Sequence, residues 1–95
     1  MFWVYILQCA DATFYVGHTD CLEARIAQHQ QGSFRSCYTF ERRPLEIRFS
    51  QSFPTRAEAL SAERMIKGWS RAKKTALIEG DWSEVSRLAA FQYWK

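Results

Sequence analysis

The spacing of apolar residues divides the chain into short strands and helices. Phe2 to Gln8 is rich in aromatic and β-branched residues, and so is Thr13 to Gly17 after a turn at Asp11-Ala12, which predicts an antiparallel hairpin. Leu45 to Phe53 alternates apolar with polar residues, the period-2 pattern of a strand with one buried face. The side chains expected on that buried face are Leu45, Ile47 and Phe49.

The first predicted helix begins at Asp20 and ends at Gln31. Asp20 stands in the N-cap position with Glu23 three residues later, the spacing of a capping box. Gly32 is a natural C-terminal stop, because glycine readily adopts the left-handed conformation that ends many helices. The apolar ridge that should pack on the sheet consists of Leu22 and Ile26.

Two more helices are predicted from capping signals. Thr55, with Glu58 three residues on, opens a helix that should run to about Trp69. Ser70 offers a new N-cap for a helix from Arg71 to Glu79.

Residues 33–44 are expected to form a loop, and Asp81 is expected to cap a C-terminal helical segment, 81–95. The order strand-strand-helix-strand-helix-helix predicts an α+β fold, a three-stranded antiparallel sheet flanked by helices. We expect a single domain, 1–95, with its core in residues 2–79.

Composition agrees with a compact domain. The 95 residues are 47% hydrophobic and include 4 Trp, 7 Phe and 4 Tyr, which excludes an intrinsically disordered chain. The 3 cysteines form no C-x-x-C pair, so a disulfide framework is not expected. The expected location is the reducing cytoplasm. The first residues lack the pattern of a signal peptide, and no apolar run approaches the ~20 residues of a membrane span.

Positive charge is unevenly distributed along the chain. The net charge of +3 is too small to specify a partner, but the basic residues fall in blocks that suit phosphate neutralisation. Solvated helix faces are the common alternative explanation for such blocks. The candidate nucleic-acid-binding residues are Arg35, Arg42, Arg43, Arg64, Lys67, Arg71, Lys73 and Lys74.

Several polar side chains are candidates for chemistry. Tyr5 and Tyr15 approach each other if the hairpin forms, although tyrosines also commonly fill half-buried strand faces. Arg25 and His29 are spaced i, i+4, so they share one helix face, where the arginine could bind phosphate and the histidine could move a proton. The alternative is a surface arginine and a histidine bonded to backbone.

Glu63 lies at the margin of an apolar helix face, where an acid is unusual without a partner. It could hold Mg²⁺, which commonly takes one or two protein carboxylates. The competing explanation is an ordinary i, i+4 ion pair with Lys67. A zinc site at His18 and Cys21 is less favoured, because no second pair stands at ligand spacing.

Taken in their order along the chain, these candidate residues resemble the pattern of the GIY-YIG nuclease superfamily. The likeness is strongest to small stand-alone bacterial members and to the nuclease domain of structure-specific endonucleases. Trp3-Val4-Tyr5 and Tyr15-Val16-Gly17 stand where the two signature triplets belong. The segment from His18 to Gly32 resembles the following loop and helix, and Ala57 to Glu63 resembles the helix with the metal-binding glutamate. The likeness covers roughly residues 2–79.

The resemblance implies a mechanism. Glu63 would hold one divalent ion, Mg²⁺ or Mn²⁺, and Arg25 would stabilise charge on the phosphate. Tyr5, helped by His29 or Tyr15, would act as general base, which requires a phenol pKa lowered by the metal or the arginine. Gly17 would permit close backbone approach.

The sequence also departs from the family pattern, because Trp3 replaces the first glycine and the chain contains no asparagine to support the metal. The leading hypothesis is therefore a metal-dependent endonuclease that acts on DNA, with branched or damaged DNA as candidate substrates. The alternative is a non-catalytic module on the same fold that binds nucleic acid or protein. We also expect a protein partner that supplies substrate binding. The expected oligomeric state is a monomer or a weak dimer. The C-terminal aromatic residues are expected to cap the core: Trp82, Phe91, Tyr93 and Trp94.

Overall fold

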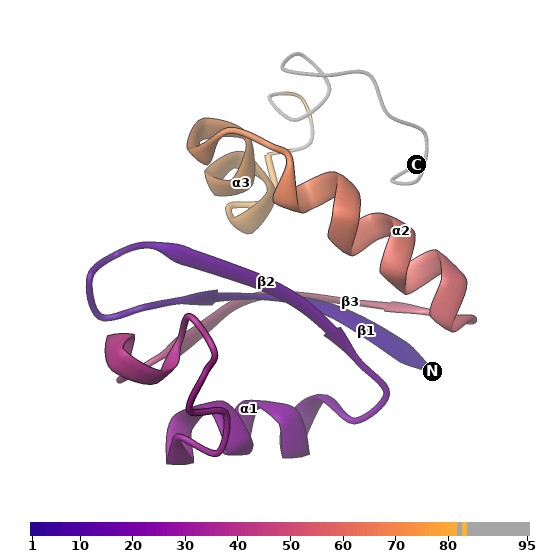
Figure 1. Ribbon diagram of the computed structural model, residues 1–95. Coiled ribbons are helices and arrows are strands. Elements are labelled where there is room, and N and C mark those ends of the chain that lie inside the picture. Colours follow the sequence, from indigo (N-terminus) through magenta and orange to yellow (C-terminus); the bar gives the residue numbers. More distant parts are fainter. Residues whose placement is uncertain (82, 84–95) are drawn as a thin grey trace.

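The computed structural model describes residues 1–81 and 83, which form an antiparallel three-stranded sheet with helices on both faces (Figure 1). The strands are β1 (Phe2–Gln8), β2 (Phe14–Thr19) and β3 (Glu46–Phe53), in the order β2-β1-β3. The predicted α+β class and its antiparallel sheet are thus confirmed.

Helix α1 (Leu22–Gln31) covers one face of the sheet, and α2 (Arg56–Lys67) and α3 (Arg71–Ile78) cover the other (Figure 1). The segment expected to be an irregular loop contains a short 3₁₀ helix, η1 (Phe40–Arg42).

The central strand β1 is buried on both faces, because successive side chains of a strand point in opposite directions. Val4 and Ile6 join a cluster with Ala59, Ala62 and Ile66 of α2 and with residues of α3. Tyr5 and Leu7 point the other way, into a second cluster against α1 that also contains Cys9 and Leu45, with the predicted ridge of Leu22 and Ile26 packed against it. The single strand β1 therefore contributes side chains to both hydrophobic clusters.

The prediction that Ile47 and Phe49 share one buried face of β3 is wrong. A register irregularity lies opposite Ile6 and Leu7, which pair with Phe49 and Ile47 and leave Arg48 as the extra residue. Such a bulge reverses the alternation beyond it. Phe49 consequently packs on the α2–α3 side, while Ile47 lies with Leu7 toward the α1 side and stays 41% exposed.

Capping was predicted correctly for two helices and wrongly for one. The Thr55 hydroxyl accepts from the Glu58 amide at 3.2 Å, and the Ser70 hydroxyl accepts from the Lys73 amide at 3.3 Å. Helix α1 begins one residue later than expected: Cys21 is its N-cap, and in the described structure its side chain makes no capping bond. The cause is Thr19, whose hydroxyl accepts from the Cys21 amide and holds this turn extended.

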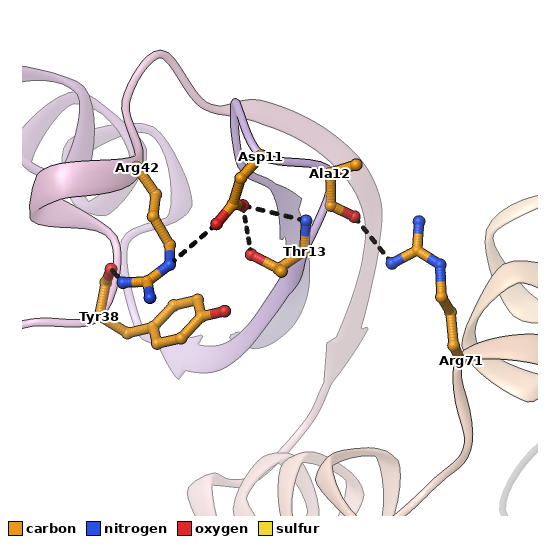
Figure 2. A network of polar contacts seen from close by, with 6 residues as sticks. All are labelled: Asp11, Ala12, Thr13, Tyr38, Arg42 and Arg71. Carbon is orange, nitrogen blue, oxygen red and sulfur yellow. Dashed lines mark hydrogen bonds and ion pairs between the residues drawn. The ribbon is translucent and has the colours of Figure 1, made fainter.

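The turn between β1 and β2 is held from both sides of the sheet (Figure 2). On the α1 side, Arg42 of η1 donates to the Asp11 carboxylate at 3.1 Å, and its guanidinium lies over the Tyr38 ring. On the other side, Arg71 at the start of α3 donates to the Ala12 carbonyl oxygen at 2.7 Å. Ala12 itself has a φ of 70°, which fits its place in a tight turn.

The predicted C-terminal helical segment and its capping aromatic residues lie outside the described part of the chain, apart from Asp81 and Ser83. Within the described residues, none of the helices has the length and apolar character needed to cross a bilayer.

The capping difference predicts that Thr55→Ala lowers the free energy of unfolding by about 1 kcal/mol, because a helix amide loses its acceptor. Asp20→Ala should change it by less than about 0.5 kcal/mol, since Asp20 is exposed and its ion pair with Arg56 in the described part of the chain is long, at 4.0 Å. Urea denaturation of both variants measures this. A loss for Asp20→Ala as large as for Thr55→Ala would contradict the assigned start of α1.

Candidate active site

The centre of the candidate site is a buried hydrogen bond between Tyr5 of β1 and His29 of α1. The Tyr5 hydroxyl lies 3.0 Å from His29 Nε2, and the two residues are 0% and 2% exposed. The i, i+4 spacing of Arg25 and His29 does bring both toward the hairpin, as the sequence predicted: His29 bonds Tyr5, and the Arg25 charge acts on the same phenol.

The Tyr5 ring fits because the residue opposite it on β2 has no side chain. Tyr5 and Gly17 are direct cross-strand partners. A Cβ at Gly17 would lie 2.6 Å from the Tyr5 hydroxyl oxygen and 2.7 Å from the adjacent ring carbon, closer than such atoms can approach. The glycine of the second triplet is therefore required by the tyrosine of the first.

Tyr15 and Phe34 complete an aromatic group around His29. The ring centroid of Tyr15 lies 5.2 Å from that of His29, and the ring of Phe34 lies 5.0 Å away on an edge-to-face contact. The Arg25 guanidinium stands 5.4 Å from the Phe34 centroid. These groups open onto a pocket of about 230 Å³, lined by Tyr15, Arg25, His29, Phe34, Ser36 and Cys37.

The loop after α1 adds two residues that the sequence did not single out. The Thr39 hydroxyl, 1% exposed, lies 2.9 Å from His29 Nδ1 and 3.5 Å from the Cys37 sulfur. The loop has no periodic pattern, so only the resulting fold reveals that it closes over α1.

Burial controls the protonation of these groups. It raises the pKa of Tyr5 to about 12, although the nearby Arg25 charge and hydrogen bond act to lower it. It also raises the pKa of Tyr15, with a further contribution from Tyr5. The pKa of His29 is lowered, first by burial and then by the Arg25 charge. The lowered tyrosine pKa that the resemblance required is therefore not found; both phenols are held protonated and the imidazole neutral.

Glu63 lies on α2, so it approaches from the other face of the sheet. Its Oε1 is 2.9 Å from His18 Nδ1, and its Oε2 is 3.4 Å from Lys67 Nζ. The expected Lys67 pair is therefore present. His18 was missed as a partner, because its place on β2 beside α2 follows from the sheet register rather than from spacing along the chain.

The two halves of the site meet around β2, an edge strand. Consecutive residues of this strand face opposite ways, so Gly17 adjoins Tyr5 on the α1 side while His18 contacts Glu63 on the α2 side. The Glu63 charge is near enough to contribute to the raised pKa of both Tyr5 and Tyr15.

The basic residues predicted to bind nucleic acid differ in accessibility. Arg35 and Arg64 are exposed, and Lys74 is half-buried. Lys73 is the least accessible, because it is 8% exposed and its ammonium group lies over the Trp69 ring. Others contact the protein itself through a carboxylate, a carbonyl or a ring: Arg42, Arg43, Lys67 and Arg71.

No group of three or more His, Cys, Asp or Glu side chains that could hold a metal ion occurs among the described residues. A protein-only metal cage, including the alternative zinc site, therefore has no basis in this part of the chain. A single carboxylate such as Glu63 suits an ion that keeps most of its waters.

Comparison with known families agrees with this geometry. Residues 1–76 match the family described as the GIY-YIG catalytic domain. The chain belongs to the GIY-YIG family. GIY-YIG domains are a family of nucleases that generally use divalent metal ions.

The relatives found are small proteins of the same family. A UPF0213 protein of Halobacterium salinarum is 40% identical over 78 residues, which span 82% of this chain and 100% of the relative. The UPF0213 protein YazA of Bacillus subtilis is 40% identical over 75 residues, 79% of this chain and 75% of the relative.

Two solution NMR structures share the GIY-YIG fold of this chain. That of a UPF0213 protein from Bacillus halodurans has a TM-score of 0.55 at 33% identity and covers 96% of this chain and 100% of its own. That of a protein from E. faecalis has the same TM-score, 0.55, at 28% identity, and covers 98% and 93% of the two chains.

The close approach at Gly17 predicts that Gly17→Ala lowers the free energy of unfolding by about 1–3 kcal/mol, because the added methyl group must displace the buried Tyr5 ring. Gly68→Ala is the matched control: its Cβ would meet its nearest neighbour, the Met65 carbonyl oxygen, at 3.5 Å, an ordinary contact. Urea denaturation should therefore separate the two variants. Equal stabilities would show that the Tyr5 ring does not need the space.

The lowered pKa of His29 predicts an acid-sensitive contribution to stability. Below the unfolded-state value of 6.5 the unfolded chain binds a proton that folded His29 does not, so stability falls as pH falls. The slope from this residue is at most about 1.4 kcal/mol per pH unit. Unfolding free energies measured from pH 7.5 to 5 should fall more steeply for the native sequence than for His29→Gln; parallel curves would contradict the prediction.

Proposed function

We propose that this protein is a divalent-metal-dependent endonuclease that hydrolyses phosphodiester bonds in DNA. The observation that carries the proposal is the buried Tyr5–His29 hydrogen bond beside Arg25, at a pocket in a domain of a nuclease family. Arg25 and His29 line this pocket, and the buried Tyr5 hydroxyl lies directly behind His29. A guanidinium, a neutral imidazole and a phenol are groups that can bind a phosphate and activate water.

Arg25 is the phosphate-binding group in this proposal. Its half-buried guanidinium lines the pocket beside Tyr15 and His29. A guanidinium can donate two parallel hydrogen bonds to phosphate oxygens, and it stabilises the charge that develops on them during hydrolysis. Its contact with the Phe34 ring orients it without using up its donors.

Tyr5 and His29 act together as the general base. With the pKa of Tyr5 near 12, the phenolate fraction at pH 7 is only on the order of 10⁻⁵, so a free phenolate cannot carry the reaction. A tyrosine that passes its own proton to His29 Nε2 while taking one from water avoids that problem. His29 suits this part because its lowered pKa keeps it neutral before the reaction.

Glu63 is the proposed metal ligand, and its contacts leave room for it to bind an ion. A carboxylate has about four lone-pair positions, and His18 and Lys67 engage one on each oxygen. When bound, Mg²⁺ or Mn²⁺ would polarise the phosphate and stabilise the leaving 3′ oxygen. His18 fixes the direction of the Glu63 carboxylate from β2, so it is a positioning residue in this scheme.

Branched or damaged DNA is the substrate class that we propose to test first. The exposed Arg35 lies in the loop that lines the pocket, and the exposed Arg64 follows Glu63 on α2, so basic groups flank both halves of the site. Such contacts would follow a bent or forked backbone around β2. A protein partner that supplies substrate binding would add affinity that 95 residues alone supply weakly.

The decisive variant is Glu63→Gln, which keeps the size and polarity of the side chain but removes its charge. We expect metal-dependent cleavage of flap or junction DNA to fall by more than about 10²-fold, because the single carboxylate that holds the ion is lost. Glu58→Gln, an exposed glutamate on the same helix, is the matched control and should cut at the native rate.

Labelled flap, junction and duplex DNA with Mg²⁺ or Mn²⁺ provides the assay. Cleavage that survives in Glu63→Gln would refute Glu63 as the ligand. Binding without cleavage by the native protein on every substrate would instead favour the non-catalytic binding module.

A further inference from the structure

The hydrogen bonds of the site continue beyond His29 into the loop after α1. His29 Nε2 faces the Tyr5 hydroxyl at 3.0 Å, and His29 Nδ1 faces the Thr39 hydroxyl at 2.9 Å. The Thr39 hydroxyl in turn lies 3.5 Å from the Cys37 sulfur. Tyr5, His29 and Thr39 are each at most 2% exposed, so these bonds are shielded from bulk solvent, and a reacting water reaches them through the pocket that His29 lines.

The direction of each bond follows from the far end of this chain. Thr39 donates its one hydroxyl hydrogen to the Cys37 sulfur, so toward His29 its oxygen can only accept. His29 must then carry its hydrogen on Nδ1, where it donates to Thr39. Nε2 is left with a free lone pair, and the Tyr5 hydroxyl donates to it.

The surroundings of Cys37 strengthen this direction. Burial would raise the pKa of its thiol, but hydrogen bonds from the Thr39 and Tyr15 hydroxyls and from backbone amides outweigh burial and lower that pKa. This agrees with the geometry, in which the Thr39 hydroxyl donates to the Cys37 sulfur at 3.5 Å.

We propose that Thr39 and Cys37 are positioning residues that hold His29 as its Nδ1–H tautomer and so aim the Nε2 lone pair at the Tyr5 hydroxyl. The inference rests on the proposed function, because it assigns the tautomer that the general base needs. In the opposite tautomer Nε2–H would donate to the Tyr5 oxygen, and His29 would have no lone pair with which to accept the tyrosine proton.

The proton balance of the step is then complete. A water that enters through the pocket lined by His29 gives one proton to the Tyr5 oxygen as its own oxygen bonds to phosphorus, and the Tyr5 hydroxyl proton moves to Nε2. The bond from phosphorus to the 3′ oxygen breaks, and the 3′ oxygen takes a proton from solvent as it leaves. The imidazolium that forms keeps its Nδ1–H bond to Thr39, and the polarised sulfur of Cys37 behind it favours the positive charge. Tyr5 is a phenol before and after the step.

The tautomer can be measured without any substrate, from the ¹⁵N chemical shifts of the imidazole nitrogens. Native His29 should show a protonated Nδ1 and a bare Nε2. In Cys37→Ala the Thr39 hydroxyl loses its acceptor and can donate to Nδ1, so a shift toward the Nε2–H form is expected. Cys37→Ser keeps an acceptor and should retain the native tautomer, as should Cys21→Ala, which removes an exposed cysteine elsewhere.

Thr39→Val should also shift the tautomer, and Thr39→Ser should restore it. Both Thr39 variants must first show native-like amide spectra. If either does not fold, the milder Cys37→Ala variant decides whether the loop sets the tautomer. An Nε2–H form in the native protein, or an unchanged tautomer in Cys37→Ala, would overturn the proposal.

Cleavage kinetics then test the consequence. We expect kcat to fall about 10- to 100-fold in Cys37→Ala with KM unchanged, a part of the roughly 10²- to 10⁴-fold that a positioned base contributes. A shifted tautomer with native kcat would refute the positioning role. If the native protein cuts no DNA while the tautomer results are as expected, the proposed nuclease function fails and the assignment of the hydrogen bonds stands.

Discussion

A phenol hydroxyl buried within a sheet needs a hydrogen-bond partner, and in this fold the partner of Tyr5 is His29 of α1. That requirement fixes the rest of the α1 side. The helix must present His29 at the sheet, the neighbouring strand must leave space at Gly17, and the loop after α1 must satisfy the second imidazole nitrogen through Thr39. The residues proposed to act in catalysis are thus also the ones that the buried tyrosine requires for packing.

The site gains its second half from the geometry of an edge strand. Because β2 has a neighbour on one side only, the proposed function places one substrate around its free edge, in reach of groups on both faces of the sheet. Tyr5 and Arg25 belong to the α1 face, and Glu63 reaches β2 from the α2 face through His18.

Much of this arrangement could be predicted from local patterns. The bounds of β1 and the caps at Thr55 and Ser70 follow from residue type and spacing, and the structure agrees. The family signature likewise predicted Tyr5 and Glu63 as site residues. Where predictions were wrong, tertiary contacts decided: Thr19 bonds the Cys21 amide and displaces Asp20 as the cap of α1. The contributions of Thr39 and His18 depend on a loop closure and a strand register, which leave no mark in a one-dimensional pattern.

The extra residue at Arg48 has a consequence for how the strand can change over evolution. Upstream of it Leu45 belongs to the core under α1, and downstream Phe49 and Phe53 belong to the core under α2 and α3. Removing or adding one residue elsewhere in β3 would exchange the two sets and bury polar side chains in both cores. Insertions and deletions among relatives should therefore be tolerated at Arg48 and excluded from the rest of the strand.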